Sequence, residues 1–515
     1  MRVVYVISVF VEVLQYYVLR LCVLTVNNVF MSATQKTTQK TTQKKSKAAH
    51  DQPYPPAFVD FMLQGWKNEM PKMPKKIRGA QHYALRRTTL GKAFEGEYLI
   101  VPTGHEKVRA NDTNFRFRPG TDFFYLTGND EADCVLVMEP AGKGHKHILF
   151  VEPNPGRSEP TFFTDRHKGE LWVGPRLGME ESLHRFQVDA CRNLGDLPEY
   201  LRAIKLGKDA FRLVEGASSL VEAVLPKQEK KNLELMRAIS EMRLIKSRFE
   251  IGLLKEACEM TRRGFDDVVR CLKDAQTERE VEAAFVRRAR IDGNDVGYNV
   301  IAAGGANACI LHWGRNDSAL SQKDLLLLDA GVEGQHLYTA DITRTIPISG
   351  KYSPVQKVIY DLVRAAQKAA IEAVKPGVSF LAPHWAAMAV LAEGLEKLEL
   401  LPGTAEEAMH SENQFFKRFT LHGVSHMLGM DVHDCSWASP KRYRNGLLEP
   451  GMVLTIEPGL YFQKDDLTVP RKYRGIGVRI EDDVLVTKTG SEILTDVPRD
   501  SDEVEAWMAE LWAEC

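Results

Sequence analysis

Four acidic residues lie in stretches that otherwise have the composition of buried β-strands. Each stands among leucine, isoleucine, valine or glycine residues, and the four are Asp329 in 325–331, Asp341 in 337–345, Glu457 in 453–461 and Glu481 in 475–483. One such aspartate alone is ordinarily explained by an arginine partner or a turn cap. Four need a common explanation, because a buried carboxylate without a nearby cation is costly and neighbouring carboxylates repel each other. Together they indicate a site that binds cations.

A histidine-rich segment accompanies these acids. Residues 421–434 place His422, His426 and His433 among apolar and glycine residues, although any one of them alone is more often a satisfied core histidine. Four carboxylates and one imidazole can hold two divalent cations and a bridging hydroxide as a nearly neutral buried cluster. This oxygen-rich set suits manganese, cobalt, iron or zinc. The chemistry that it predicts is metal-assisted hydrolysis, in which the ions activate water and polarise a carbonyl or phosphoryl oxygen.

The strands that carry these groups belong to the second of two predicted domains. In the first domain, short apolar runs separated by turns predict strands at 97–101, 123–126, 134–138 and 147–151. Flanking helices make this part α/β. From Met242 onward, apolar residues at helical spacing predict a long amphipathic helix. We therefore expect an N-terminal α/β domain over 51–238 and a C-terminal catalytic domain over 239–515, an α/β (α+β) chain overall.

The segments around the acids resemble the signature segments of the pita-bread metallopeptidases, in the branch that contains Xaa-Pro aminopeptidase (aminopeptidase P) and prolidase. They are DAG at 329–331, DITRT at 341–345, HGVSHMLGMDVHD at 422–434, TIEPGLY at 455–461 and GIGVRIEDD at 475–483. The similarity runs from about residue 80 to residue 498. It implies a smaller ribonuclease-H-like N-terminal domain and a C-terminal pita-bread (creatinase/aminopeptidase) domain of two related halves.

The resemblance also implies which side chains bind the metal ions. Asp329 matches the carboxylate that holds one ion alone, whereas Asp341 and Glu481 match the two that bridge both ions. His426 and Glu457 then complete the shell of the second ion. Glu457 is also expected to take a proton from the bridging water and pass it to the leaving nitrogen. The first expectation for the two ions is Mn²⁺, with Co²⁺, Zn²⁺ or Fe²⁺ as alternatives.

Five further side chains are implied to act on the substrate. His312 and His433 match two histidines that hold the scissile carbonyl and stabilise the developing oxyanion. His422, Tyr461 and Arg479 match the residues that support the site and form the wall of the proline subsite. Arg479 stands two residues before Glu481 on the same strand face, from which it can also orient the carboxylates of the cluster.

The spacing of the first two ligands departs from the family's pattern. Asp329 and Asp341 are twelve positions apart, one more than the pattern contains. We therefore expect a one-residue insertion in a hairpin turn at 333–335, between strands at 325–331 and 337–345. A bulge can absorb one residue without moving either carboxylate. The assignment of Asp329 depends on this.

The substrate class follows from the chemistry of proline. An Xaa-Pro bond is a tertiary amide with no N–H and a fixed ring, so extended-strand binding sites fit it poorly and a dedicated enzyme is expected. We expect hydrolysis of the N-terminal Xaa-Pro bond of peptides with proline in the second position. Segments 118–128, 169–174 and 310–313 and Ser425 resemble aminopeptidase P more than prolidase, the dipeptidase that is the alternative. A pita-bread domain that only binds peptides is less favoured, because all five ligand positions are filled.

The amino-acid composition argues against other classes of protein, such as nucleic-acid-binding, membrane-bound and disulfide-rich proteins. The 515 residues, 44% of them hydrophobic, suffice for two domains with real cores. Lys+Arg 68 against Asp+Glu 69 gives a net charge of -1, so no global field favours nucleic acid or an anionic membrane. The eight cysteines include no CxxC pair, which is typical of free thiols in a reducing compartment and favours the cytoplasm. The family resemblance implies a homo-oligomer, a dimer or tetramer.

The first fifty residues differ from the rest. Residues 32–50 form a Lys/Thr/Gln repeat without acids and are predicted to be disordered. Residues 1–30 are apolar, but Glu12 and Arg20 interrupt them. Translation from Met31 is therefore favoured over a signal or membrane anchor. Because this extension is basic, residues 51–515 carry a net charge of about -7.

Overall fold

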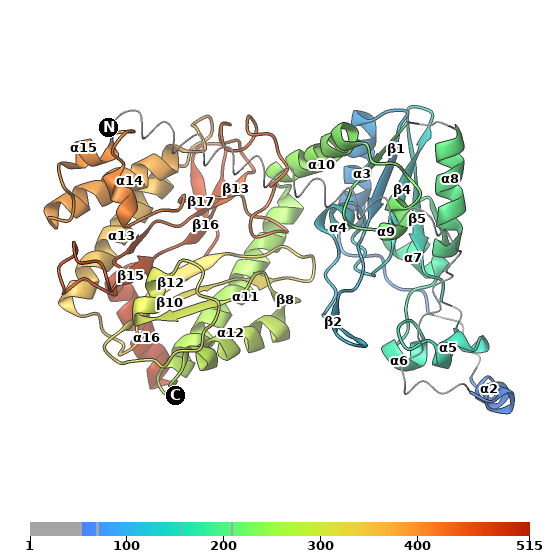
Figure 1. Cartoon of the computed structure of the whole chain (residues 1–515), viewed down its shortest axis with the longest axis horizontal. Helices are drawn as coiled ribbons and strands as arrows, with labels where there is room; N and C mark the ends of the chain where they lie inside the picture. Colours follow the sequence, from blue (N-terminus) through green and yellow to red (C-terminus); the bar gives the residue numbers. More distant parts are fainter. Residues whose placement is uncertain (1–53, 68–71, 155, 208–209, 515) are drawn as a thin grey trace, which may run out of the picture. The chain divides into compact units, whose positions relative to one another are not determined.

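The computed structural model describes residues 54–67, 72–154, 156–207 and 210–514 (Figure 1). The described residues group into two compact units, one of 54–67 with Arg157–Pro160 and one of 72–154, 156, 161–207 and 210–514. The first contains helix α2 (Pro56–Met62). The predictions for residues 1–50, including the disordered repeat and the start at Met31, lie outside the described residues. Among the described residues, no helix is long and apolar enough to cross a bilayer.

The larger unit begins with a mixed five-stranded sheet in the order β6-β5-β4-β1-β7. Its strands are β1 (Tyr98–Pro102), β4 (Val135–Ala141), β5 (Gly144–Val151), β6 (Ala190–Asn193) and β7 (Phe211–Leu213). β4 runs antiparallel to β1 and β5, whereas β6 and β7 are parallel to their neighbours at the two edges. A small hairpin of β2 (Val108–Ala110) and β3 (Thr113–Asn114) follows β1. The ribonuclease-H-like comparison stays a prediction.

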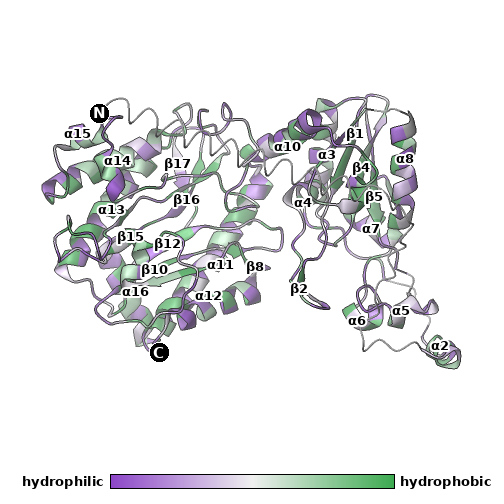
Figure 2. Cartoon of the chain, viewed as in Figure 1, coloured by the Kyte–Doolittle hydropathy of each residue, from purple (hydrophilic) through white to green (hydrophobic). Residues whose placement is uncertain are grey.

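Side chains alternate along β1, so this sheet has a core on each face. Leu99 and Val101 pack on one face with α3 (Ala80–Ala93), α4 (Thr121–Thr127) and α7 (Met179–Phe186). Ile100 packs on the other face with α8 (Leu197–Gly207) and α9 (Ser219–Glu222). The strands of the sheet are predominantly hydrophobic (Figure 2). The remaining short elements here are α5 (Thr161–Thr164), α6 (Glu170–Val173) and η2 (Leu194–Asp196), whereas η1 (Gly156–Ser158) begins in this unit and continues into the smaller one.

One of the predicted strands is a helix. The apolar run at 123–126 forms most of α4, which begins after Gly120 and is closed by Gly128 at a φ of 70°. All four residues of the run are buried. Because no polar position interrupts the run, its sequence could not distinguish a helix from a buried strand.

Two helices lead into the C-terminal part, where one was predicted from Met242. Helix α10 (Glu229–Leu244) ends first, and α11 (Arg248–Leu272) begins anew behind a capping box formed by Ser247 and Glu250. The predicted domain boundary near residue 238 falls inside α10. That division stays a prediction.

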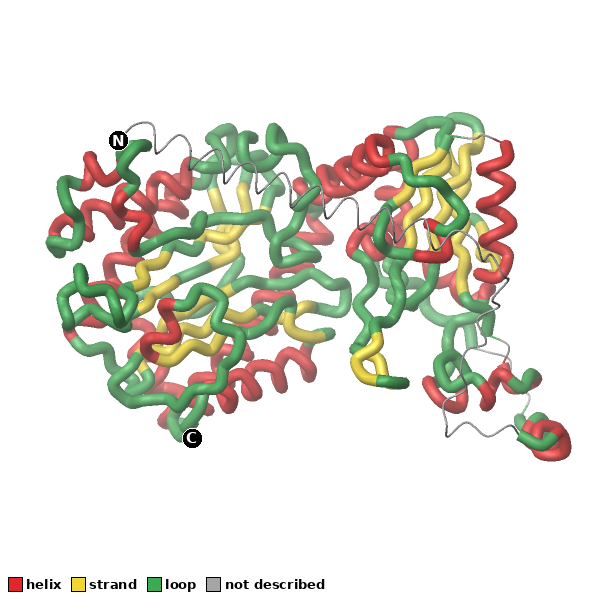
Figure 3. Tube along the Cα trace, viewed as in Figure 1, coloured by secondary structure: helices red, strands yellow, loops and turns green. Residues whose placement is uncertain are grey.

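The C-terminal part consists of two antiparallel sheets with helices around them (Figure 3). The first half contains α12 (Glu278–Asp292), β8 (Asp295–Val296), β9 (Ile301–Gly304), η3 (Gly305–Cys309), β10 (Leu325–Ala330), β11 (Val332–Glu333) and β12 (Ile342–Pro347). The second half contains α13 (Pro354–Ala373), α14 (Ala382–Lys397), α15 (Ala405–Met409), η4 (Phe415–Arg418), β13 (Val453–Ile456), β14 (Gly459–Tyr461), β15 (Gly477–Arg479), β16 (Asp482–Val486), β17 (Ser491–Ile493) and α16 (Ser501–Ala513). The sheets are β12-β10-β9 and β13-β16-β17, with the pairs β8–β11 and β14–β15 beside them.

The two halves share one hydrophobic core, which includes Leu328 from β10 and Val484 from β16. Fully buried Arg344 of β12 crosses between the halves. It donates to the Glu481 carbonyl oxygen at 2.6 Å and to Asp482 Oδ1 at 2.7 Å. The start of β12 is therefore fixed against the start of β16, and two of the predicted ligands stand at these strand starts.

Candidate active site and metal centre

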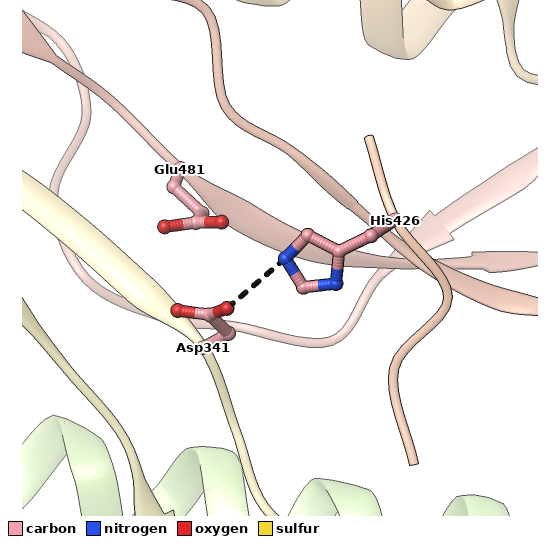
Figure 4. A group of neighbouring side chains, drawn as sticks. All are labelled: Asp341, His426 and Glu481. Carbon is pink, nitrogen blue, oxygen red and sulfur yellow. Dashed lines mark ion pairs between the residues drawn. The ribbon is translucent and has the colours of Figure 1, made fainter. Parts of the chain in front are cut away.

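Three of the predicted ligands form a tight group where the two halves meet (Figure 4). Donor atoms of Asp341, His426 and Glu481 all lie within 4.8 Å of one another. His426 Nε2 is 3.3 Å from Asp341 Oδ2. Asp341 directly precedes β12, and Glu481 directly precedes β16. The Glu481 N–H donates to the Thr343 carbonyl at 3.0 Å, which holds these two positions side by side.

Glu457 approaches the same group from the end of β13. It follows the last residue of that strand, and its backbone N–H donates to the Val424 carbonyl at 2.9 Å. The neighbouring Thr455 N–H donates to the His426 carbonyl at 3.0 Å. These two backbone bonds fix the glutamate and the histidine on adjacent segments, with Glu457 Oε1 3.6 Å from His426 Nε2.

Asp329 is joined to Asp341 through a tyrosine that was not among the predicted site residues. The Tyr298 hydroxyl lies 2.8 Å from Asp329 Oδ1 and 2.5 Å from Asp341 Oδ1. Strands β10 and β12 pair antiparallel, with Asp329 opposite Thr343. Although they are twelve positions apart in the sequence, the two carboxylates therefore still reach one hydroxyl group.

The connection between these aspartates differs from the predicted hairpin. Strand β11 pairs with β8, and β12 begins only at Ile342, so the strand predicted for 337–345 is wrong for its first five residues. The chain passes so close to itself here that a Cβ on Gly331 would lie 1.8 Å from the Ala340 carbonyl oxygen. Leu337 takes a positive φ of 63°. Pairing across this turn is limited to an isolated bridge between Glu333 and Thr339.

A cavity of about 610 Å³ lies over the cluster. Nine of the ten predicted site residues line it: Asp329, Asp341, His426, Glu457, Glu481, His312, His422, His433 and Arg479. The tenth, Tyr461, is buried and contacts the lining through its hydroxyl group. Residues that lie more than 160 positions apart in the sequence therefore meet at one cavity.

Tyr461 links two members of the lining. Its hydroxyl lies 2.8 Å from His422 Nε2 and accepts a hydrogen bond from Arg479 Nη1 at 3.0 Å. Arg479 Nη2 donates to Asp329 Oδ2 at 2.5 Å. Burial and the charge of Arg479 lower the pKa of His422 to about 4, so this imidazole is neutral at pH 7. This wall of the cavity is polar, and Arg479 supplies its positive charge.

The two remaining histidines stand on other sides of the cavity. The His433 ring is perpendicular to that of His426, at an interplanar angle of 89° with the ring centres 4.5 Å apart. Burial and the nearby His426 lower the pKa of His433. His312 lines the cavity from the segment that follows η3. Both are placed where they can face a bound ligand.

Burial disfavours the charged form of the cluster's carboxylates. It raises the pKa of Glu457 to about 7, although His426 and Arg479 act in the opposite direction. Burial also raises the pKa of Glu481, which the charge of Asp341 raises further. For His426 burial favours the neutral form, but the hydrogen bond to Asp341 and the charge of Glu457 outweigh it and raise the pKa to about 9. In the metal-free protein, the four carboxylates therefore have only His426 and Arg479 as positively charged neighbours among the described residues.

The donor set fits two divalent cations. Asp341, His426 and Glu481 have donor atoms within reach of one ion, and Asp329 and Glu457 line the same cavity. Among the described residues, the only one of these four carboxylates that forms an ion pair with Arg479 is Asp329. Oxygen donors with a single nitrogen suit manganese, iron, cobalt or zinc. Two such ions would supply the missing positive charge. Their binding would lower the pKa values of the carboxyl groups and so favour the ionised form.

Two further side chains support the ligands without being predicted site residues. Thr343 Oγ1 donates to Glu481 Oε2 at 2.6 Å, and Asp483 Oδ2 accepts the Asp341 N–H at 3.2 Å. Thr343 lies in DITRT and Asp483 in GIGVRIEDD, so the sequence motifs could have indicated both residues. Tyr298 lies in no such segment, and only the folded chain brings it to the aspartates.

Two family descriptions match this chain. Metallopeptidase family M24 matches residues 252–488, and the N-terminal domain of aminopeptidase P matches residues 83–213. The first range contains every predicted site residue. The second covers most of the five-stranded sheet domain.

Similar proteins named Xaa-Pro aminopeptidase cover most of the chain. Xaa-Pro aminopeptidase 1 of Streptomyces coelicolor is 48% identical over 455 residues, which cover 87% of this chain and 91% of that protein. Xaa-Pro aminopeptidase of Escherichia coli is 34% identical and covers 83% of this chain and 97% of its own length. The structure of zinc-substituted E. coli aminopeptidase P in complex with product aligns with a TM-score of 0.75 at 31% identity, over 85% of this chain and 99% of that one.

These matches confirm the predicted fold, an N-terminal α/β domain followed by a pita-bread domain. The chain belongs to the Xaa-Pro aminopeptidase (aminopeptidase P) branch of metallopeptidase family M24.

Proposed function

We propose that this chain is a metal-dependent aminopeptidase that hydrolyses the N-terminal Xaa-Pro bond of peptides with proline in the second position. The observation that carries the proposal is the meeting of nine predicted side chains at one cavity of about 610 Å³. Relatives that cover most of the chain are named for this activity. That naming does not favour the prolidase alternative, and the complete donor set speaks against a module that only binds peptides.

Asp329, Asp341, His426, Glu457 and Glu481 are the side chains that would hold two divalent ions, for which Mn²⁺ is the first candidate. When bound, such ions activate a water molecule and polarise the carbonyl of the scissile bond. Tyr298 and Thr343 hold carboxylates of this set in place through hydrogen bonds of 2.5 to 2.8 Å. Support of this kind fixes ligand orientation before the substrate arrives.

Glu457 is the proposed acid and base of the reaction. Its position beside the other proposed ligands, 3.6 Å from His426 Nε2, places it where a carboxylate can accept a proton from an attacking water and return it. The need for a returned proton follows from the substrate, because the proline nitrogen carries no hydrogen in the peptide bond and must gain one when it leaves. Glu457 therefore takes a proton from the attacking water and delivers it to that nitrogen.

The other lining residues act on the carbonyl and on the proline ring. His312 and His433 are proposed to hold the carbonyl oxygen as charge develops on it, which is the role of preorganised donors. His422, Tyr461 and Arg479 form the wall against which the proline residue would lie. Their mutual bonds of 2.8 and 3.0 Å keep this wall fixed.

Cellular setting and assembly complete the proposal. We propose a cytoplasmic homo-oligomer, a dimer or tetramer, without a nucleic-acid partner. In support of a reducing compartment, the six cysteines that the structure describes are all free thiols.

Hydrolysis assays test the function directly. An Xaa-Pro-Yaa tripeptide, an Xaa-Pro dipeptide and the matched Xaa-Ala-Yaa tripeptide are incubated with the metal-loaded protein, and the products are identified by mass spectrometry. Release of Xaa from the proline tripeptide alone is the expected result. Cleavage of the dipeptide alone would indicate a prolidase, and a protein that takes up no metal and cleaves none of the peptides would indicate a binding module.

A further inference from the structure

The segment 118–128 resembles aminopeptidase P, yet the proposed reaction assigns it no part. Its first residues contact the chain beside His433. We propose that Arg118 and Thr121 of the N-terminal domain are positioning residues, which set the place of His433 through the segment 430–434. This inference rests on the proposed function.

The direct contacts are made by a guanidinium and a hydroxyl group. Arg118 Nη2 donates to the Met430 carbonyl at 2.7 Å and lies 3.4 Å from Asp431 Oδ1. Thr121 Oγ1 donates to the same Asp431 Oδ1 at 2.6 Å. Arg118 Nη1 in turn donates to Thr121 Oγ1 at 3.2 Å. Each contact constrains the others, so the three side chains form one unit.

Arg118 is itself fixed on its other side. Its Nε donates to Glu333 Oε2 at 2.6 Å, and the other oxygen of this buried carboxylate accepts from Asn294 Nδ2 at 2.8 Å. An arginine that binds a buried carboxylate and a carbonyl group at the same time has little rotational freedom left. Arg118 therefore ties the segment 430–434 to β11 of the C-terminal domain.

The far end of the segment is anchored separately. Asp434 is buried, with Arg243 Nε at 3.0 Å and Lys246 Nζ at 3.3 Å from its carboxylate. Arg243 also forms an ion pair with Asp122, the residue after Thr121. Burial opposes ionisation of Asp434, but these cations outweigh it and hold its pKa below the ordinary value. Both ends of the segment are thus held by charged groups.

The residues between the anchors are the ones that face the cavity. Val432 and His433 line it, while Met430, Asp431 and Asp434 make the anchoring contacts. In this segment the position of the His433 ring depends on where residues 431 and 434 are held. Misplacement of a catalytic group by about 1 Å can cost up to a hundredfold in rate.

The test compares variants of residues that are assigned neither to the metal ions nor to the substrate. Asp431→Ala removes the contacts with Thr121 and Arg118, and a fall in kcat of about tenfold with unchanged metal content is expected. Thr121→Val, which keeps the shape and loses the hydroxyl, lowers kcat in the same direction, and Thr121→Ser restores it. As a matched control, Glu256→Ala removes an ion pair of 2.6 Å with Arg78 that joins α11 to the segment before α3, and it leaves kcat unchanged.

A double-mutant cycle separates positioning from general loosening. If Asp431 acts through His433, the Asp431→Ala change has less than about a twofold effect in a His433→Ala background. An equal loss in both backgrounds, or wild-type kcat in Asp431→Ala, would overturn the inference. Thermal unfolding of each variant shows whether the fold is kept. An inactive wild-type protein would instead contradict the proposed function, so the two failures are distinguishable.

Discussion

The Tyr298 hydroxyl lies 2.5 Å from Asp341 Oδ1, at the centre of the carboxylate cluster. The same hydroxyl is 2.8 Å from the carboxylate of Asp329. A phenol has one proton to donate, so at any moment one aspartate receives it while the other is held close by. Tyr298 therefore lies between two proposed ligands and orients the one that accepts its proton.

Replacement of Tyr298 by phenylalanine removes this hydroxyl and keeps the ring. Loss of such a supporting contact typically weakens metal binding by about 10- to 100-fold. We expect this loss in a calorimetric titration with Mn²⁺, with little change in thermal unfolding of the metal-free protein. Tyr200→Phe is the matched control, because it removes a 2.7 Å bond to Glu139 in the N-terminal sheet domain. Equal affinities for all three proteins would contradict the role given to Tyr298.

Replacement of Glu457 by glutamine tests the proton transfer. The amide keeps the shape and an oxygen donor of the side chain but cannot accept the proton, so kcat is expected to fall by at least about a hundredfold. We expect the metal content of this variant, measured by elemental analysis, to stay close to two ions per chain. A variant with near wild-type kcat would show that another group is the base.

His312 is assigned to the substrate and not to the ions. His312→Ala is therefore expected to lower kcat by about tenfold or more while the metal stoichiometry remains that of the wild type. The two quantities are measured on the same preparation. Loss of metal with the activity would mean that His312 is a ligand and that the donor set is larger than five.

The pKa of Glu457 determines whether metal affinity rises or falls with pH. In the metal-free protein burial raises the pKa of Glu457 to about 7, so below pH 7 this carboxyl group holds a proton that an incoming ion must displace. Affinity is expected to fall as the pH is lowered from 8 to 6, and binding releases protons. Calorimetry in two buffers with different ionisation enthalpies measures that release. Affinity that is constant or rises over this range would contradict the assignment.

The sequence was most informative where a residue conflicts with its surroundings. Asp329 and Glu457 stand in apolar strand sequence, and the energetic cost of burying them pointed to cations. The structure brings both to the cavity that Asp341, His426 and Glu481 share. A buried charge is a strong local signal, because few arrangements can compensate for it.

Features that depend on the path of the chain could not be predicted. The run 123–126 forms helix α4 although it is apolar throughout, and Tyr298 has an ordinary local sequence. The connection before Asp341 follows from a close approach of Gly331 to Ala340, which is a contact between segments. Local patterns carry no information on such contacts.

The most direct test of the account is cleavage of an Xaa-Pro-Yaa tripeptide before and after removal of the metal. The protein is treated with a chelator, dialysed, and assayed by mass spectrometry with and without added Mn²⁺. Release of Xaa is expected to be lost on chelation and to return with about two ions per chain, while the Xaa-Ala-Yaa tripeptide stays intact. Release of Xaa that persists in the metal-free protein, or no release with both ions bound, would contradict the proposed function.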